Sequence, residues 1–490
     1  MRILIVGNDP KEIGGVANYT RPLATKFAEM GHNVFYLYSG AYTSKYDFRL
    51  SPYLKFNKND FPFECAEIIN SVNLPFNYGH PELDMKAPEM DELISQYLDS
   101  TKPDVMHINS RFGFPTSINQ VAFDKGITVL NTIHVYGYIC QKRVMIDYEG
   151  KPCLGPSDLN KCAACTGTLN YRKERIRAVL RNYNKKLKVK APSVFNFLQQ
   201  FKRSLKSTRA TKQQLTVKSI AASAKFTEPQ LAEDLTVRLK YCTTALNSYS
   251  DKTICVSTDV KRTLMNYGVD GRRLLVQHIG SIIAEKQLAN KQYLHTPIVV
   301  GNIGGVNHYK GIHILVEAIA KVKNTNFIVR IFGKYEEDFV RSLMGKFSNL
   351  EIEFTGRYKP EDLPAILKQI DVMVLPSICN DTAPQTIFES FSGGVPIIAS
   401  NIGGFPDFVQ HDHNGLLFEA GNSDDLAEKI DFVLTDPERL IKYQQNIPKL
   451  KTITENAQEL IRLYNELLMA RSGTNTELEM ATLETKGVIG

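Results

Sequence analysis

The chain of 490 residues contains no tryptophan, and none of its apolar runs approaches the ~20 residues that a membrane-spanning helix needs. This lack excludes a bundle of membrane-spanning helices. The start, MRILIVGNDP, has an apolar run too short for a signal peptide and no small-residue cleavage site, so we expect a cytoplasmic protein. Its eight cysteines are then expected to be reduced.

The net charge of +7 comes from one segment that has almost no acids. From Arg172 to Lys218 there are fifteen Lys or Arg against one acid, Glu174, which leaves the rest of the chain at about −7. Apolar residues such as Ile176 and Leu180 recur there at helical spacing. The segment is either a solvated helix or an attachment to an anionic membrane surface. Nucleic-acid binding is disfavoured because the chain has no recognised nucleic-acid module.

Short apolar runs that alternate with helical patterns predict two consecutive α/β domains. The first begins with a strand at 3–7, a glycine-rich loop, a helix over 16–30 and a second strand, and further strands follow at 102–110, 127–137 and 253–258. The pattern breaks near Gly280 and a second run begins, with strands at 298–303, 327–333, 352–356, 371–377, 395–400 and 415–418. The predicted fold is therefore two Rossmann-like, doubly wound domains.

The predicted boundaries follow the same pattern. The first domain covers 1–281, with a cysteine-rich loop at 140–165 and a basic, partly helical insertion at 166–245. A linker covers 282–297 and the second domain covers 298–453. An amphipathic helix covers 454–470, and the small, polar residues 471–490 are expected to be disordered.

The stretch DTAPQTIFES, residues 381–390, combines two acids with a predicted helix start. Pro384 suits the first turn of a helix over 385–392 that ends at Gly393. The free N–H groups at its start favour an anion such as a diphosphate. Asp381 precedes this end, and Glu389 lies about two turns, or ~9 Å, further along the axis. The two acids are therefore spaced to flank different parts of one extended ligand.

This stretch and SGGVPIIASNIGGFPDFVQHDHNGLLF after it resemble the donor-binding signature of the retaining, GT-B-type glycosyltransferases of family 4. Four other stretches match the family in the same order: EIGGVANYTRPLATKFAEMGHNV, KPDVMHINS, TIHVYGYIC and GNIGGVNHYKGIHILVEAI. The resemblance implies a GT-B fold, with two domains that face a cleft and the last helix crossing back to the first domain.

The resemblance implies transfer of a sugar from a nucleotide-diphosphate sugar to a hydroxyl of a glycan or lipid-linked acceptor, in cell-surface polysaccharide biosynthesis and without a catalytic cofactor. Lys310 would neutralise the diphosphate, Asp381 and His134 would contact the transferred sugar, and Glu389 would bind the ribose. The implied catalytic residues are His134, Lys310 and Asp381. The implied donor-binding residues are Gly14, Gly15, Gly305, Arg357, Thr382, Ala383, Gln385, Thr386 and Glu389.

Three positions depart from the family pattern. Asp381 stands where the family usually has Glu, and Gly305 stands where it usually has Arg, so that Arg357 would have to supply a second cation. Val135 replaces the acid that usually follows the strand-end histidine. These departures leave the donor preference open. They also leave two alternatives, a sugar-nucleotide epimerase of the same fold and an inactive protein that docks at membranes.

Four cysteines, Cys140, Cys153, Cys162 and Cys165, follow the pattern C-x12-C-x8-C-x2-C. The C-x2-C spacing is typical of zinc ligands, and four thiolates complete a structural, non-catalytic zinc site. Reduced thiols that pack in the interior explain the pattern equally well, and a disulfide fits a reducing compartment less well. All three alternatives stay open at the level of the sequence.

Overall fold

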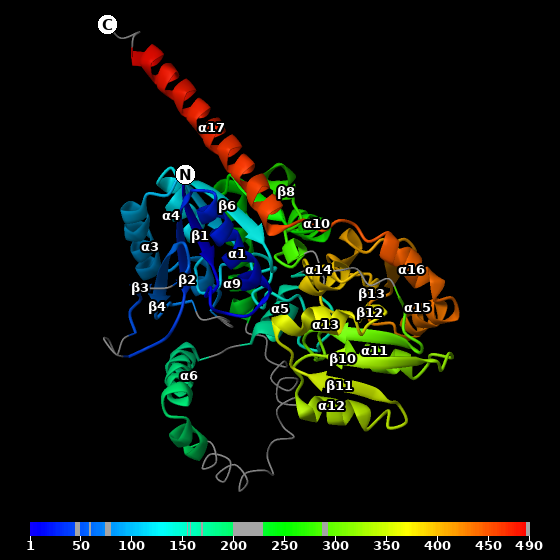
Figure 1. Cartoon of the computed structure of the whole chain (residues 1–490). Helices are drawn as coiled ribbons and strands as arrows, with labels where there is room; N and C mark the ends of the chain where they lie inside the picture. Colours follow the sequence, from blue (N-terminus) through cyan, green and yellow to red (C-terminus); the bar gives the residue numbers. More distant parts are fainter. Residues whose placement is uncertain are drawn as a thin grey trace.

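Two parallel β-sheets, each covered by helices, form the cores of two domains that lie side by side (Figure 1). The computed structural model describes residues 1–44, 50–57, 60–73, 80–153, 155–156, 158–167, 170–198, 229–286 and 293–486. The predicted GT-B architecture of two Rossmann-like domains is confirmed. No helix among these residues is long and apolar enough to cross a membrane.

The first domain has an eight-stranded sheet in the order β3-β4-β2-β1-β5-β6-β7-β8, parallel except for the pair β3 and β4. Its strands are β1 (Arg2–Gly7), β2 (Asn33–Ser39), β3 (Tyr53–Asn57), β4 (Glu64–Ile69), β5 (Val105–Ile108), β6 (Thr128–Ile133), β7 (Lys252–Cys255) and β8 (Leu274–Val276). Its helices are α1 (Gly15–Glu29), α2 (Pro81–Met85), α3 (Pro88–Thr101), α4 (Ile118–Asp124), α5 (Leu159–Thr166), α6 (Tyr171–Lys190), α9 (Pro229–Ser248) and α10 (Thr258–Asn266).

Strand β1 shows why this sheet is buried on both faces. Its side chains alternate, so Ile3 and Ile5 join one hydrophobic cluster while Leu4 and Val6 join the other. The first cluster includes residues of α1, and the second includes residues of α3 and α4. A continuous apolar run is what a parallel strand covered on both faces requires.

The second domain has a six-stranded parallel sheet in the order β11-β10-β9-β12-β13-β14. Its strands are β9 (Ile298–Ile303), β10 (Phe327–Phe332), β11 (Ile352–Gly356), β12 (Val372–Leu375), β13 (Ile397–Ser400) and β14 (Gly415–Phe418). Its helices are α11 (Ile312–Ile319), α12 (Glu337–Met344), α13 (Leu363–Leu367), α14 (Gln385–Ser392), α15 (Ser423–Thr435) and α16 (Glu438–Gln445). The strand order reverses between β9 and β12, and such a switch point is where doubly wound sheets bind ligands.

The chain passes between the domains twice, and the two passages run together. Ser281 and Thr452 form an isolated parallel bridge. Gly280 allows this approach, because a side chain there would place its Cβ 2.2 Å from the carbonyl oxygen of Thr452. After the second passage, α17 (Ile453–Lys486) packs on the first domain, where Ile453, Ala457, Leu460 and Tyr464 enter its core.

The last helix is longer than the sequence predicts. We expected disorder from Arg471 onward, but α17 continues to Lys486 and extends away from the domains (Figure 1). Glu, Leu, Met and Ala recur in this part of the sequence, and they are strong helix formers. A helix already nucleated by its packed first turns extends at little further cost.

Helix α6 and most of α9 belong to the predicted basic insertion at 166–245, and α6 lies at the lower left of Figure 1. Val179 packs against Tyr42 and Leu50 of the first domain, and Asn182 donates a hydrogen bond to the carbonyl of Tyr42. The basic stretch expected over 172–218 is described as far as residue 198, and its remainder lies outside the described residues.

Candidate active site

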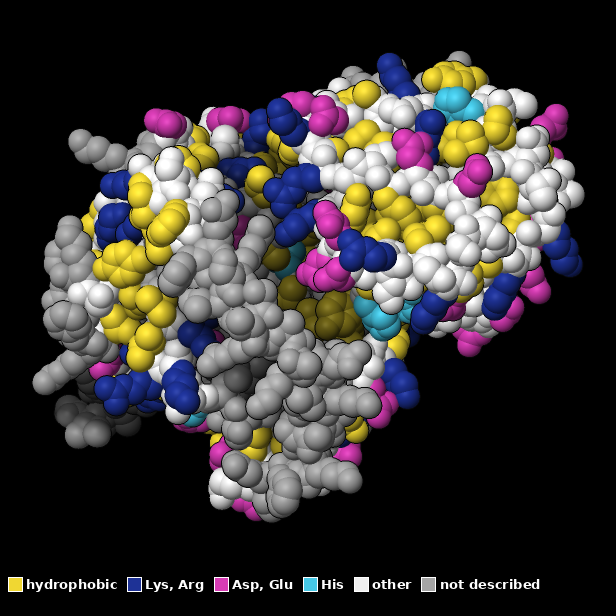
Figure 2. Space-filling model, turned by 90° about the horizontal axis from the view of Figure 1, so that it is seen from below, with side chains coloured by type: hydrophobic (Ala, Val, Ile, Leu, Met, Phe, Trp, Pro, Cys, Tyr) yellow, Lys and Arg dark blue, Asp and Glu magenta, His cyan; other side chains and the backbone are white. Residues whose placement is uncertain are grey.

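A cavity of about 350 Å³ lies between the two domains. The first domain lines it with Gly15, Val16, His134, Val135 and Ile279. The second domain lines it with Lys310 and with the continuous segment from Asp381 to Thr386. Figure 2 shows the hollow between the two domains, with charged side chains at its rim. Residues from both domains that the sequence predicts as site residues therefore meet at one place.

Lys310 and Asp381 form an ion pair at this cavity. The Lys310 ammonium donates to both carboxylate oxygens of Asp381, at 2.9 and 2.8 Å, and the hydroxyl of Ser377 donates to the same carboxylate at 2.9 Å. Burial alone would lower the pKa of Lys310, but the Asp381 carboxylate beside it raises that pKa above its ordinary value. Lys310 therefore stays protonated and supplies a fixed positive charge.

The start of α14 supplies further donors beside this charge. Pro384 takes the N-cap position, and no side chain caps the helix. The first N–H groups of a helix have no partner within the helix, so these groups are available to an anion. Gln385 and Thr386, in the first turn, line the cavity. Lys310 and Thr386 also line a second cavity of about 40 Å³, together with Gly305.

Glu389 lies one turn further along α14, and its environment is apolar. Burial raises the pKa of its carboxyl to about 7. Tyr358 lies close enough for this carboxylate to contribute to raising the pKa of the tyrosine. Within the described part of the chain, no hydrogen bond or ion pair to the Glu389 side chain is found. A half-buried carboxylate of this kind is suited to accept hydrogen bonds from a ligand.

His134 faces α14 from the end of β6. Burial lowers the pKa of its imidazole to about 3, so the ring is neutral at physiological pH. Its Nε2 lies 3.4 Å from Oδ1 of Asn109, and its backbone carbonyl accepts a hydrogen bond of 2.7 Å from the Thr382 hydroxyl. Thr382 therefore connects the domains through its side chain, while the residues after it line the cavity.

Gly15 gives the backbone of the first domain a close approach to α14. A Cβ built at this position would lie 3.9 Å from Cγ of Gln385. Gly14 precedes it as the N-cap of α1, with an extended backbone and no side chain near. The glycine-rich loop and the start of α14 thus face each other across the cavity.

Known proteins match both the sequence and the fold. A family model described as glycosyl transferases group 1 matches residues 284–450. The second domain belongs to this glycosyltransferase family. The family, also numbered 4, is the one that the sequence predicts, and that prediction is confirmed. Spore coat protein SA of Bacillus subtilis is 26% identical over 208 residues, which cover 40% of this chain and 52% of that protein.

Another relative is the sulfoquinovosyl transferase SQD2 of Arabidopsis thaliana, 28% identical over 145 residues, 29% of this chain and 27% of that protein. The chain spans about half the length of Spore coat protein SA and less of SQD2.

Solved structures share the fold over almost the whole chain. Sucrose-phosphate synthase of Thermosynechococcus elongatus superposes with a TM-score of 0.59 at 17% identity, covering 96% of this chain and 99% of the other. HepE of Anabaena, in complex with UDP and glucose, gives a TM-score of 0.55 at 14% identity, covering 95% and 99%. At these identities the likeness establishes the fold alone.

Three predicted donor-binding residues, Gly14, Glu389 and Arg357, are not among the residues that line the cavity between the domains or the smaller cavity beside it. Arg357 is the one of the three that does not adjoin α1 or α14. It follows β11, is exposed, and lines neither cavity beside Lys310. Its neighbour Tyr358 is the residue that lies near Glu389. Since Gly305 carries no charge, Lys310 is the cation that the lining residues of these two cavities provide.

The predicted zinc site is not found. Cys140, Cys153, Cys162 and Cys165 are free of disulfides and line one cavity of about 210 Å³. Among the described residues, however, no group of three or more His, Cys, Asp or Glu side chains could hold a metal ion. Burial, together with the neighbouring cysteines, raises the pKa of Cys162 to about 12, so without a metal this side chain is a neutral thiol.

Sequence reasoning missed two residues that make contacts at the cleft between the domains. Ser377 follows β12 and binds Asp381, and its position at a strand end was an available signal. Asp407 accepts hydrogen bonds across the domain boundary from the Thr258 N–H at 2.7 Å and from His278 Nε2 at 2.9 Å. Nothing in the local sequence marks Asp407 as a residue of the boundary.

Proposed function

We propose that the chain transfers a sugar from a nucleoside-diphosphate sugar to a hydroxyl of a glycan or lipid-linked acceptor, with retention of the anomeric configuration. The observation that carries this proposal is the cavity between the domains, where a lysine and an uncapped helix start face a glycine loop and a neutral histidine. Retention, and a place in cell-surface polysaccharide synthesis, rest on the resemblance to family 4.

The second domain holds the donor. Lys310 and the first N–H groups of α14 bind the diphosphate, and both stabilise the negative charge that develops as the glycosidic bond breaks. Glu389 accepts hydrogen bonds from the ribose, and Asp381 accepts them from the sugar. On binding, the diphosphate competes with Asp381 for the Lys310 ammonium, which frees the carboxylate for the hydroxyls of the sugar.

The first domain holds the acceptor against the reacting carbon. His134 remains neutral, so its ring donates or accepts a hydrogen bond without adding charge. The contacts between the domains keep water out of the closed cleft, which favours transfer over hydrolysis. HepE is described as binding UDP-glucose, so UDP-sugars are the first donors to test.

A thermal-shift panel of UDP-, GDP- and ADP-sugars tests the donor site. A ligand that binds only the folded state increases the free energy of unfolding, by about 2.7 kcal/mol at a concentration of 100 times its Kd, and so raises the melting temperature. We expect one nucleotide class to raise it and the double variant K310A/D381A to lose the shift. Failure of every nucleotide sugar to shift the wild-type protein would refute the donor site.

Incubation with the bound donor separates the remaining alternatives. A transferase leaves the donor intact, apart from slow hydrolysis, until an acceptor is added. A sugar-nucleotide epimerase converts the donor with no acceptor present. If the donor binds but neither reaction occurs with any lipid-linked or glycan acceptor, the chain is a binding protein.

We also propose that α6 attaches the enzyme to an anionic membrane surface. At ~100° per residue, Ile176, Leu180 and Tyr183 lie within about 60° of one another, next to Lys173, Arg177 and Arg181. The three apolar side chains are 50%, 56% and 44% exposed, although Val179 on the docked face is buried. Figure 2, seen from the side of α6, shows hydrophobic side chains bordered by Lys and Arg on this part of the surface.

Such an arrangement fits a helix that lies in the membrane interface, since an apolar stripe beside a basic band matches acyl chains beside anionic headgroups. A solvated helix has no use for three exposed apolar residues on one stripe. The interface position would bring the enzyme to a lipid-linked acceptor, which connects this surface with the proposed reaction.

Sedimentation with vesicles tests this surface. We expect the protein to bind phosphatidylglycerol vesicles and not phosphatidylcholine vesicles, with affinity that falls as salt rises. The variant R177E/R181E should lose binding, whereas R341E/K346E, on exposed positions of the second domain, should keep it. Equal binding by both variants would show that α6 is only a solvated helix.

A further inference from the structure

The His134 ring is positioned by Tyr19, a residue that does not line the cavity. The two ring centroids lie 4.9 Å apart with the ring planes inclined by 56°. Tyr19 belongs to α1 and is buried, while His134 follows β6 on the neighbouring part of the fold. The hydrogen bond between His134 Nε2 and Oδ1 of Asn109 is long, at 3.4 Å, and therefore weak. The packing of the Tyr19 ring against the His134 ring is therefore the stronger constraint on the orientation of the imidazole.

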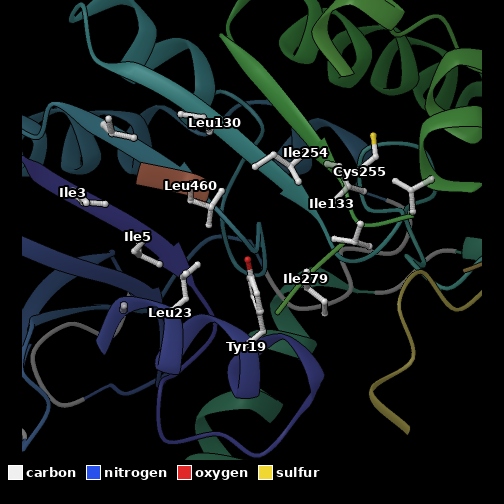
Figure 3. Packing of buried hydrophobic residues seen from close by; sticks show 14 of the residues in the cluster. Ile3, Ile5, Tyr19, Leu23, Leu130, Ile133, Ile254, Cys255, Ile279 and Leu460 are labelled. Atoms are coloured by element: carbon white, nitrogen blue, oxygen red, sulfur yellow. The ribbon is translucent and has the colours of Figure 1, made fainter. Parts of the chain in front are cut away.

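Tyr19 is itself fixed from the far end of the sequence. Its hydroxyl donates a buried hydrogen bond of 2.8 Å to Oδ1 of Asn456, in the first turns of α17. Figure 3 shows Tyr19 among Leu23 of α1, Ile279 and Leu460 of α17, with its hydroxyl directed toward the side of Leu460. A buried tyrosine hydroxyl with one partner cannot move without losing that bond to an apolar environment.

Asn456 also binds the passage between the domains. Its Oδ1 accepts a second hydrogen bond of 3.1 Å from the N–H of Gly280, and its amide donates to Glu459. Gly280 lies in the first passage and Thr452 in the second, and the absence of a side chain at Gly280 lets them touch. Asn456 is therefore joined to both passages and to Tyr19 at once.

We infer that Asn456 and Tyr19 are positioning residues that set the orientation of His134 from the passage between the domains. The second domain holds the backbone of His134 through Thr382, and this chain of contacts holds its ring. A change in the passages as the domains move against each other is thus transmitted to the ring that faces the transferred sugar. The expected effect on kcat rests on the proposed transferase function, whereas the expected effect on the orientation of the His134 ring does not.

The test is the variant Tyr19→Phe, which deletes one hydroxyl and keeps the ring. The control is Tyr443→Phe, which deletes the hydroxyl of another buried tyrosine; this hydroxyl donates a partly buried hydrogen bond to Asp412, in the second domain and outside the cavity. We expect both variants to lose a similar amount of thermal stability. Only Tyr19→Phe should lower kcat, by about five- to tenfold, with the donor KM unchanged, since Tyr19 does not line the cavity and the diphosphate and ribose are held by Lys310 and α14.

A second readout does not depend on catalysis. The ring signals of His134 in NMR spectra of histidine-labelled protein should shift or broaden in Tyr19→Phe and in Asn456→Leu, and stay in place in Tyr443→Phe. Unchanged His134 signals and an unchanged kcat in a folded Tyr19→Phe protein would overturn the inference. If the wild-type protein shows no transfer but the signals still shift in this way, the proposed function fails while the positioning role stands.

Discussion

The two domains contribute different kinds of groups to the cavity between them. The second domain provides a protonated lysine, the carboxylate of Asp381 and an uncapped helix start, and the buried carboxyl of Glu389 lies one turn further along the same helix. The first domain provides a glycine without a side chain, a neutral histidine and the apolar Val16, Val135 and Ile279. The second domain therefore provides the charged groups of the cleft and the first domain its uncharged walls, which suits the proposed reaction between an anionic donor and an uncharged hydroxyl.

The same contrast extends beyond the cavity. The second domain keeps the strand order of a doubly wound nucleotide-binding sheet and carries the whole family match. The first domain adds an antiparallel edge strand, a cysteine-lined loop and the basic helix α6. Enzymes that use the same class of donor can share one donor-binding domain, here the second domain. The acceptor and its location differ between such enzymes, which fits the additional elements of the first domain.

The largest effect that follows from this division is expected for Lys310→Ala. It removes the cation that the lining of the cavity supplies to the leaving diphosphate, and a single such group is worth about 10²- to 10³-fold in kcat. The control is Lys321→Ala, a lysine of similar exposure whose ion pair with Asp424 lies outside the cavity. Initial rates of sugar transfer provide the measurement, and equal rates for both variants would contradict the division of roles.

Asp381→Glu is expected to change which sugar is transferred. It restores the acid usual in the family and lengthens the side chain by one methylene, while the charge beside Lys310 is kept. The ratio of kcat/KM between donor sugars should change by about tenfold, because a carboxylate placed for one set of hydroxyls misses another. The preference among nucleotides should stay the same. Competition between UDP-sugars measures the ratio of kcat/KM between donor sugars. A changed preference among nucleotides would show that Asp381 contacts the nucleotide rather than the sugar.

How far the sequence predicts these features depends on how local they are. The strands of the second sheet and the bounds of α14 are apolar runs with nearby stop signals, so the sequence predicts them to within about two residues. The strands β3, β4 and β8 at the edges of the first sheet were not predicted, and β3 has no buried side chain that could give an apolar pattern. The bond between Tyr19 and Asn456 joins residues 437 positions apart, and hydrogen bonds leave no periodic pattern. Zinc was one of three alternatives that the sequence left open for the four cysteines, because ligand spacing gives the residue types but not the distances between sulfur atoms, and no metal-ligand group is found among the described residues.

Glu389 predicts a dependence on pH that the first domain does not share. Burial raises its pKa to about 7, so the folded protein holds this proton over a range where the unfolded chain has lost it, and its stabilising effect falls as pH rises toward 7. Donor affinity should change in the opposite direction, because only the carboxylate accepts two ribose hydroxyls. Isothermal titration with UDP from pH 5.5 to 8.5 should show tighter binding at high pH.

The variant Glu389→Gln separates these effects. It should melt at a higher temperature than the wild type at pH 8, with a smaller difference at pH 5, and its donor affinity should lose the dependence on pH. A wild-type affinity that stays constant between pH 5.5 and 8.5 would show that the carboxyl of Glu389 does not contact the donor.

The smallest effect is expected in the first domain, for Gly15→Ala. The new methyl group would lie 3.9 Å from Cγ of Gln385, an ordinary contact, so the fold accommodates it. Alanine is also the better helix former, by up to about 1 kcal/mol, and melting should stay constant or rise slightly. The methyl group nevertheless narrows the space between the glycine loop and α14, so the donor KM should rise by about two- to fivefold. A loss of stability without a change in KM would mean that Gly15 serves α1 rather than the cavity, and the first domain would then shape the site through His134 alone.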